Sequence, residues 1–143
     1  MLKKIVLYFL VPVGIILCFY IAYLQLFRPI IFARTISKLD IPINTSVVAF
    51  KEQWSGLNGN GYALSKLEVD DEQLENIVKQ CHAGNYHILP IEQSQLNYND
   101  ENIGMLISDK DVGFYKSIFL KDEFSIIIVN TRKGTITTYT SIF

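Results

Sequence analysis

The chain has 143 residues, half of them hydrophobic, and a mean hydropathy of +0.24 that is high for a water-soluble protein. A chain of this length holds one domain, or one domain with an appendage. Its charge is unevenly placed: residues 1–38 carry five basic side chains and no acid, whereas residues 39–143 carry all 14 acids against eight basic side chains, a net charge of −6. An acidic domain is repelled by phosphate backbones, so we expect no nucleic-acid partner.

The first element is a run of 23 residues without a charge, from Ile5 to Phe27. As a helix rising about 1.5 Å per residue it is about 34 Å long, enough to cross a hydrocarbon core of about 30 Å. A cleavable signal peptide has an apolar region of only about 7–15 residues and a small-residue cleavage site, which is missing here. Leu17 before Cys18 also argues against a lipoprotein signal. We therefore predict an uncleaved single-pass anchor over residues 1–33, held in the bilayer through residues 5–27.

Basic residues flank the apolar run on both sides, at Lys3, Lys4, Arg28 and Arg34. We expect these four side chains at the membrane interface, where their charge meets anionic headgroups. Under the positive-inside rule, the basic residues on the two sides of the apolar run favour opposite orientations in the membrane. The short tail with Lys3 and Lys4 favours a cytoplasmic N-terminus. The domain is then expected outside the cytoplasm. Cysteine usage does not decide the side, because Cys81 has no partner within the domain.

A short linker is expected between the anchor and the domain. Pro29 disfavours a helical conformation at Arg28, which predicts the end of the spanning helix there, with residues 30–33 continuing along the membrane surface. Residues 34–45 then form an extended linker, and residues 46–143 form the single folded domain.

The first part of the domain is predicted to be a hairpin followed by a helix. Strands are expected over residues 46–54 and 62–69, joined by a turn over residues 56–61 whose two Asn-Gly pairs supply the positive φ angles of a tight hairpin. A helix is expected over residues 71–82, with Asp70 as the N-cap of a capping box and one apolar stripe at helical spacing.

The second part of the domain is predicted to be mostly extended. Ile126 to Val129 is apolar on both faces, which indicates a strand in the middle of the sheet, covered on one side by the predicted helix. The whole chain is thus predicted as α+β: an N-terminal single transmembrane helix followed by a small antiparallel β-sheet meander of about five strands with one packed helix. The expected segments are extended pieces over 86–91, 103–107 and 113–120, a polar loop or irregular helix over 92–102, and a closing hairpin of 124–129 and 135–143.

The glycine-rich turn is the first candidate for a binding site. A phosphate-binding loop needs a lysine and leads into a helix, whereas this turn leads into a strand. A plain hairpin is therefore favoured, and the alternative is a ligand or partner that approaches it beside an exposed Trp, a common interface anchor. The candidate binding residues are Trp54, Asn58, Asn60 and Tyr62.

Metal and cofactor sites are not expected. Cys81, His82 and His87 are too few for a structural zinc site, and adjacent helix residues point about 100° apart, which also separates a Cys-His nucleophilic pair. The acidic turns at 99–102 and 109–113 lack the register of a calcium loop, so they are interpreted as solvated turns, with a weak divalent site as the alternative.

Three segments stand out together: the turn Trp54-Ser-Gly-Leu-Asn-Gly-Asn-Gly61, the step Ile88-Leu89-Pro90-Ile91, and the closing strand pair. In this combination the chain resembles a family of small, uncharacterised bacterial membrane-anchored envelope proteins. The resemblance covers residues 46–143 and implies a Gly-x-x-Gly-x-Gly hairpin, a following helix and a C-terminal strand pair, but no activity. Family positions with His and Asp in the turn are Ser55, Asn58 and Asn60 here, which argues against a metal or acid role.

The domain shows no serine in a nucleophile turn and no other catalytic set, so we do not expect an enzyme. We predict a membrane-tethered, non-enzymatic protein-binding module. One concrete form is an immunity or inhibitor protein that intercepts a toxin or an envelope enzyme. The alternatives are an accessory subunit or assembly factor of a membrane protein complex, and a small-ligand sensor.

Overall fold

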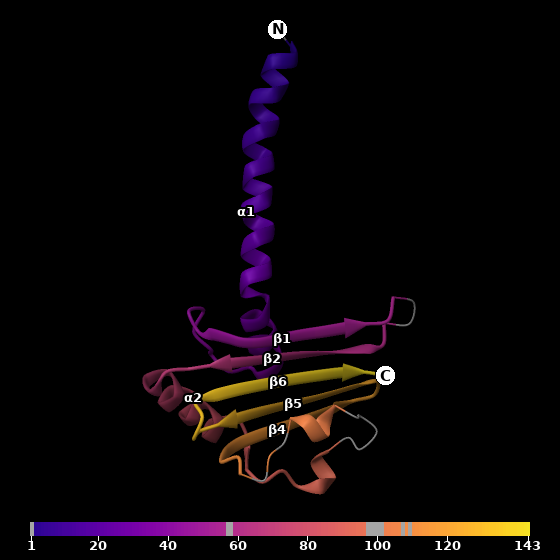
Figure 1. Cartoon of the computed structure of the whole chain (residues 1–143). Helices are drawn as coiled ribbons and strands as arrows, with labels where there is room; N and C mark the ends of the chain where they lie inside the picture. The colour runs from indigo at the N-terminus through magenta and orange to yellow at the C-terminus, as the bar shows by residue number, and fades with distance from the viewer. Residues whose placement is uncertain (1, 57–58, 97–101, 107, 109) are drawn as a thin grey trace.

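The structure, a computed structural model, describes residues 2–56, 59–96, 102–106, 108 and 110–143. One long helix rises from the edge of a six-stranded antiparallel sheet, and a second helix packs on the sheet (Figure 1). The α+β class is confirmed, with six strands in place of about five. The elements are α1 (Leu2–Ser37), β1 (Ser46–Trp54), β2 (Gly61–Glu68), α2 (Asp71–Ala83), β3 (His87–Ile88), the 3-10 turns η1 (Gln93–Gln95) and η2 (Ile103–Met105), β4 (Gly113–Leu120), β5 (Glu123–Asn130) and β6 (Thr135–Ile142).

α1 is a single helix that continues past both of its prolines. Its segment Val11–Ser37 has a mean hydropathy of 1.9, and in the described part of the chain it is the one helix long and apolar enough to cross a membrane. We expected the spanning helix to end at Arg28 and Pro29 and residues 30–33 to continue along the membrane surface, but one unbroken helix runs on to Ser37. Pro29 deprives the helix of one backbone hydrogen bond, to the Gln25 carbonyl. Packing of the following turns against the sheet offsets that loss.

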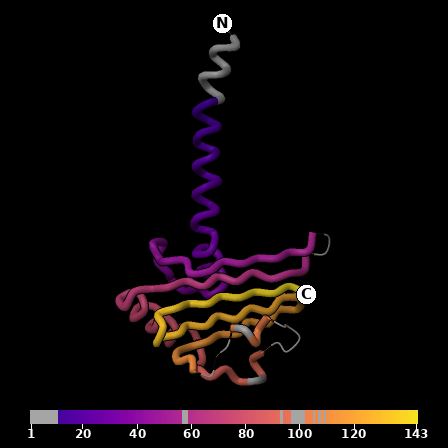
Figure 2. Tube along the Cα trace, in the orientation of Figure 1, coloured from indigo at the N-terminus to yellow at the C-terminus, as the bar shows by residue number. Residues whose placement is uncertain are grey.

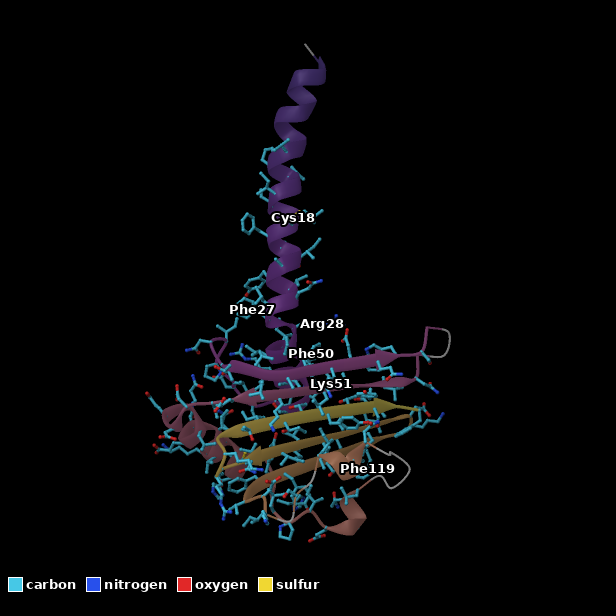
Figure 3. The ribbon with its side chains drawn as sticks, in the orientation of Figure 1. Cys18, Phe27, Arg28, Phe50, Lys51 and Phe119 are labelled. Atoms are coloured by element: carbon cyan, nitrogen blue, oxygen red, sulfur yellow. The ribbon has the colours of Figure 1, made fainter. Side chains whose placement is uncertain are left out.

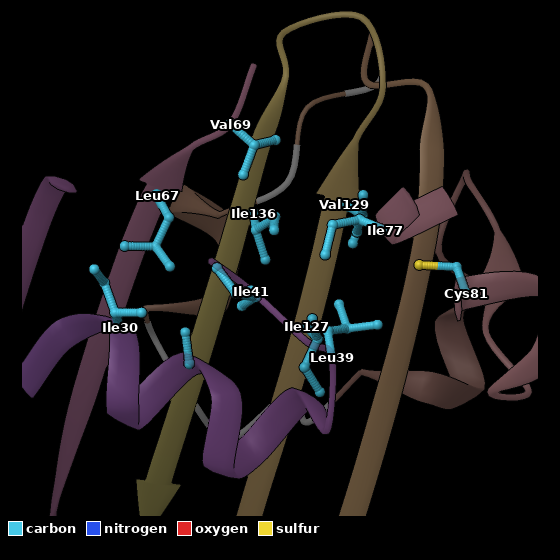
Figure 4. Close-up of a cluster of buried hydrophobic side chains, with 11 residues drawn as sticks. Ile30, Leu39, Ile41, Leu67, Val69, Ile77, Cys81, Ile127, Val129 and Ile136 are labelled. Atoms are coloured by element: carbon cyan, nitrogen blue, oxygen red, sulfur yellow. The ribbon is translucent and has the colours of Figure 1, made fainter. Parts of the chain in front are cut away.

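The last two turns of α1 are part of the hydrophobic core of the domain. Ile30 and Ala33 are at most 2% exposed, and Ile41, just after the helix, is fully buried. They pack against apolar side chains of β2, β5 and β6 (Figure 4). Burying one isoleucine contributes about 1.5–3 kcal/mol, so a chain segment with such residues is held on the sheet. Residues 34–45, expected to be an extended linker, instead begin as the last turn of α1, and Leu39 and Ile41 enter this core.

The sheet has the strand order β1-β2-β6-β5-β4-β3, with every pair antiparallel. β1 and β2 form the predicted hairpin, and β4, β5 and β6 form a meander. Between these two units the chain crosses to the far edge of the sheet and returns to place β6 beside β2, so the sheet is not a meander from end to end. β5 lies in the middle and is buried from Phe124 to Asn130, as predicted.

Both faces of the sheet are covered. The first face packs against α2 and the end of α1, and α2 begins with the predicted capping box. In that box the backbone N–H of Gln73 donates to Asp70 Oδ1 at 2.8 Å, and the backbone N–H of Asp70 donates to Gln73 Oε1 at 3.4 Å. The second face packs against the chain between β3 and β4. The tube in Figure 2 shows this segment lying low on the sheet, at the end away from α1.

The segment between β3 and β4 differs from its prediction. Ile103–Met105 is a 3-10 turn where a strand over 103–107 was expected, and that expectation was wrong for the described residues. Ile103 is 5% exposed and closes the second core, so its burial does not require a strand. A short apolar run has the same composition whether it forms a strand or a 3-10 turn, so composition alone does not distinguish the two. Of the extended piece expected over 86–91, only His87–Ile88 pairs as a strand.

Candidate functional site

A cleft of about 640 Å³ lies where α1 leaves the sheet, above the outer edge of β1. We call it the helix–edge cleft. α1 contributes two side chains, β1 contributes four consecutive residues and β2 contributes one. Figure 3 labels Arg28 at the foot of α1, close to Phe50 and Lys51 of β1. The lining residues are Gln25, Arg28, Phe50, Lys51, Glu52, Gln53 and Tyr62.

The strand register explains why residues from both faces of β1 reach this cleft. Side chains alternate along a strand, so Phe50 and Glu52 point to the face that packs on α1, while Lys51 and Gln53 point to the other face. Among the described residues, β1 pairs only with β2 and is an edge strand, so the cleft extends over its free backbone edge. Ser65, opposite Phe50, donates its hydroxyl hydrogen to the Pro29 carbonyl at 3.0 Å and fixes α1 against β2.

Arg28 is the central cation of the cleft. Its Nη2 lies 2.9 Å from Glu52 Oε2, and its guanidinium carbon lies 6.0 Å from the centre of the Phe50 ring. That ring in turn meets Phe32 of α1 edge-on at 6.2 Å. The Arg28 side chain is still 57% exposed, and an ion pair at such a site contributes at most about 1 kcal/mol. The guanidinium therefore keeps donors available for a ligand. With Lys51, the cleft carries a net charge of +1.

A second hollow of about 410 Å³ adjoins the cleft along α1. Ile21, Leu24 and Ile31 line it, together with Gln25 and Arg28, which also line the helix–edge cleft. These five side chains recur at three- and four-residue spacing and so lie on one stripe of the helix. The two hollows thus share Gln25 and Arg28; the hollow on α1 is lined mainly by apolar side chains and the cleft mainly by polar ones.

Exposed apolar side chains border the cleft along β1. Val47 is 42% exposed, Val48 is 50% exposed, and Trp54 at the other end of the strand is 42% exposed. The Trp54 ring lies over Gly61, where an added Cβ would come within 2.9 Å of it and would collide with the Gln53 carbonyl. A glycine at the start of β2 therefore makes room for this ring.

The structure brings together only part of the predicted binding set. Tyr62 lines the cleft and stacks on Tyr139 with ring centres 5.9 Å apart. Trp54 and Asn60 lie beyond the cleft, at the end of the hairpin, where the Asn60 carbonyl accepts from the Ser55 amide at 2.7 Å. Asn58 lies outside the described residues.

The four basic residues expected at an interface also separate. Arg28 lines the cleft, but Arg34 donates to the Ile41 carbonyl and lies 3.6 Å from Asp40, so it bonds within the domain. Lys3 and Lys4 lie in the first turn of α1, and their side chains are outside what the structure describes.

Sequence reasoning missed Phe50, Lys51 and Glu52 as site residues. One signal was present, because adjacent charges in the middle of a strand are typical of an edge strand. Nothing in the local sequence paired that edge with residues of α1.

The cysteine and histidine side chains of the domain are occupied in packing. Cys81 is buried in the first core, and burial raises the pKa of its thiol to about 12, which suppresses the nucleophilic thiolate. The His82 ring meets Phe114 edge-on at 4.9 Å, and the His87 ring contacts Tyr115 at 5.4 Å. In the described ranges, no three His, Cys, Asp or Glu residues are placed to hold a metal ion. The acidic turns fall partly outside those ranges, at 99–101 and 109.

No protein-family model, curated protein or solved structure matches this chain. The resemblance to the envelope-protein family therefore stays a prediction, and the function is inferred from the geometry of the domain and its anchor.

Proposed function

We propose that the chain is a single-pass membrane protein whose domain is a non-enzymatic protein-binding module, held close to the bilayer in one fixed pose. The observation that carries the proposal is the continuity of α1. Its apolar part has the length and composition of a membrane span, and its last two turns are built into the core. A flexible linker would let a domain tumble, whereas a helix shared between anchor and core holds it in place.

This pose brings a defined part of the domain to the membrane. The strands run across the direction of α1, and β1 is the strand nearest to the rising helix (Figure 1). Arg28, the first charged residue after the apolar run, lies at the level of β1 through its contact with Glu52. Val48 and Trp54 on the same strand suit an interface, since apolar and aromatic side chains are stabilised there.

A surface for a protein partner lies at one end of the sheet, where β4 meets β5. Phe119 is 52% exposed, Leu120 is 62% exposed and Phe143 is 51% exposed. The Phe143 amide donates to the Asp122 carbonyl at 3.0 Å, which holds this residue beside the turn. Asp122 and Glu123 supply two acidic neighbours and Lys121 one basic neighbour, a net charge of −1. We call these three apolar residues the end patch; Phe119 and Leu120 point to opposite faces of β4, so the patch lies around the end of the sheet. Its chemistry fits a partner with an apolar pocket rimmed by basic side chains.

An immunity or inhibitor protein at the cell envelope is the concrete form that we favour. The motivation is a compact, acidic domain of net charge −6 that is joined closely to its anchor. Lys3 and Lys4 favour a cytoplasmic N-terminus, and with that orientation the domain lies outside the cytoplasm. Protease added to intact cells is expected to remove the domain, and full protection would contradict this side of the membrane.

Site-specific photocrosslinking in intact membranes tests the protein-binding function. A photoreactive residue at Leu120 is expected to give one adduct of discrete mass, whereas the same residue at Glu75, exposed on α2, is not. Adding Phe143→Asp should abolish the adduct, because it places a charge in the apolar contact. Absence of any adduct at Leu120, or equal adducts at both positions, would count against the end patch.

An anchor exchange separates this function from that of an accessory subunit or assembly factor. Replacing residues 5–27 by an unrelated apolar helix leaves the end patch intact, so the Leu120 adduct should persist. Loss of the adduct would favour a complex in which α1 itself makes the protein contact.

A further inference from the structure

The helix–edge cleft and the apolar hollow beside it are open depressions that offer a polar and an apolar surface next to one another, as an amphipathic ligand requires. The two hollows share Gln25 and Arg28, and their volumes are about 640 and 410 Å³. The apolar hollow is lined on α1 by Ile21, Leu24 and Ile31, on both sides of Arg28, and the cleft is lined mainly by charged and hydrogen-bonding side chains. A ligand that fills both must have an apolar tail and a polar head joined near the level of Arg28.

The polar half has the chemistry of an anionic headgroup site. Arg28 and Lys51 offer positive charge from two sides, one from α1 and one from the free edge of β1. Gln25 and Gln53 also line the cleft and offer neutral donors and acceptors. Glu52 brings the net charge to +1, which balances the single negative charge of a phosphodiester. Its carboxylate also accepts hydrogen bonds from hydroxyl groups on the head.

The apolar half suits an acyl chain. Ile21 is 48% exposed and Leu24 is 42% exposed, and both lie within the uncharged run that we assign to the bilayer. From Arg28 back to Ile21 the helix rises about 10 Å, about a third of a hydrocarbon core. A chain in this hollow therefore enters the bilayer alongside α1, with its head at the interface.

We infer that the helix–edge cleft binds one anionic phospholipid with a hydroxylated headgroup, of the phosphatidylglycerol type, and that its acyl chain occupies the hollow lined by Ile21 and Leu24. The phosphate lies between Arg28 and Lys51, and the headgroup hydroxyls donate to Glu52. The lipid thereby bridges α1 and β1 and reinforces the pose of the domain. This inference rests on the proposal that α1 spans a bilayer.

Native mass spectrometry of the full chain, released from nanodiscs of defined lipid composition, tests the inference. From nanodiscs of equal parts phosphatidylglycerol and phosphatidylcholine, the chain is expected to retain one phosphatidylglycerol. Lys51→Gln should lower this occupancy about fivefold, the factor for one basic residue near an anionic surface. Lys51 has no ion pair within 4.0 Å among the described residues, so its replacement spares the fold.

Matched variants control for charge and for hydrophobicity. Lys121→Gln, in the exposed turn between β4 and β5, makes the same charge change far from the cleft and should leave the occupancy unchanged. Leu24→Ala should lower occupancy, whereas Leu26→Ala, at a residue 70% exposed that lines neither hollow, should not. Equal occupancy in Lys51→Gln and Lys121→Gln, or equal retention of the two lipids by the unaltered chain, would overturn the inference.

Two further measurements distinguish a bound lipid from a free anion and test the membrane span by itself. Inorganic phosphate at millimolar concentration should not displace the lipid, and displacement would mean that the cleft binds a free anion instead. Alkaline extraction of vesicles tests the anchor. A chain that leaves the vesicles refutes the membrane span, whereas a chain that stays but shows no lipid preference refutes only the lipid site.

Discussion

Thr138 and Thr140 make a matched pair in the middle of β6. Both side chains point to the face that packs on α1 and α2, and they are 0% and 4% exposed. The Thr140 hydroxyl lies 2.6 Å from the Ser125 hydroxyl, whereas the Thr138 hydroxyl has no hydrogen-bond partner among the residues that the structure describes. Thr138→Val and Thr140→Val each replace a hydroxyl group with a methyl group on the same strand. The difference between their effects therefore isolates the contribution of the hydrogen bond.

The two substitutions are expected to change stability in opposite directions. A buried hydroxyl without a partner costs about 1–3 kcal/mol, so Thr138→Val should raise the free energy of unfolding by about 1 kcal/mol. Thr140→Val removes a made hydrogen bond and should lower it by about 1 kcal/mol, with Ser125 left to donate to Glu123 Oε1 at 3.2 Å. Threonine and valine are both β-branched, so strand propensity changes little.

Thermal unfolding of the full chain in nanodiscs measures the difference. Trp54 is the only tryptophan, and its fluorescence reports on the end of the β1–β2 hairpin while α1 stays in the bilayer. A change of about 1 kcal/mol corresponds to a shift of about 4–8 °C in Tm for a domain of this size, upward for Thr138→Val and downward for Thr140→Val. Equal destabilisation by both substitutions would refute the reasoning, because it would mean that the Thr138 hydroxyl also has a partner.

Three other changes probe the core, the thiol and the helix cap. Ile41→Ala, in the segment expected to be a linker, should lower the free energy of unfolding by about 2–5 kcal/mol. Ile43→Ala, at a residue 43% exposed, should change it by less than about 0.5 kcal/mol. Equally small effects of both substitutions in chemical denaturation would mean that this segment is a linker and not part of the core. Burial raises the pKa of Cys81 from 9.0 to about 12, so the neutral thiol stabilises the fold below pH 9 and this contribution is lost as the pH rises toward 12. In a Cys18→Ser background at pH 9–10, iodoacetamide should modify Cys81 only after unfolding, and fast modification of the folded chain would contradict its burial. Asp70→Ala should cost about 1 kcal/mol by removing the N-cap of α2, seen as a lower Tm, whereas Asp71→Ala should cost less, because Asp71 lies inside the first turn and is not the capping residue.

Local sequence patterns determined the secondary elements well. The strand Ser46–Trp54 has the predicted bounds, the Asp70 capping box is formed, and Ile126 to Val129 lies in the central strand. Each of these depends on residues within a few positions of one another: hydrophobic alternation, a capping side chain and an apolar run. The physical causes are local, so the sequence itself contains them.

Tertiary packing decided what the sequence left open. Pro29 and the mixed polar segment from Arg34 onward resemble the end of a helix and a linker, but Ile30 and Ile41 pack on a face of the sheet, and their burial outweighs the local preference. The pairing of β2 with β6 joins residues more than 60 positions apart, which no local period specifies. The helix–edge cleft arises in the same way. Arg28 and Lys51 lie 23 positions apart, and they line one cleft because the core that buries the end of α1 also brings the free edge of β1 beside it.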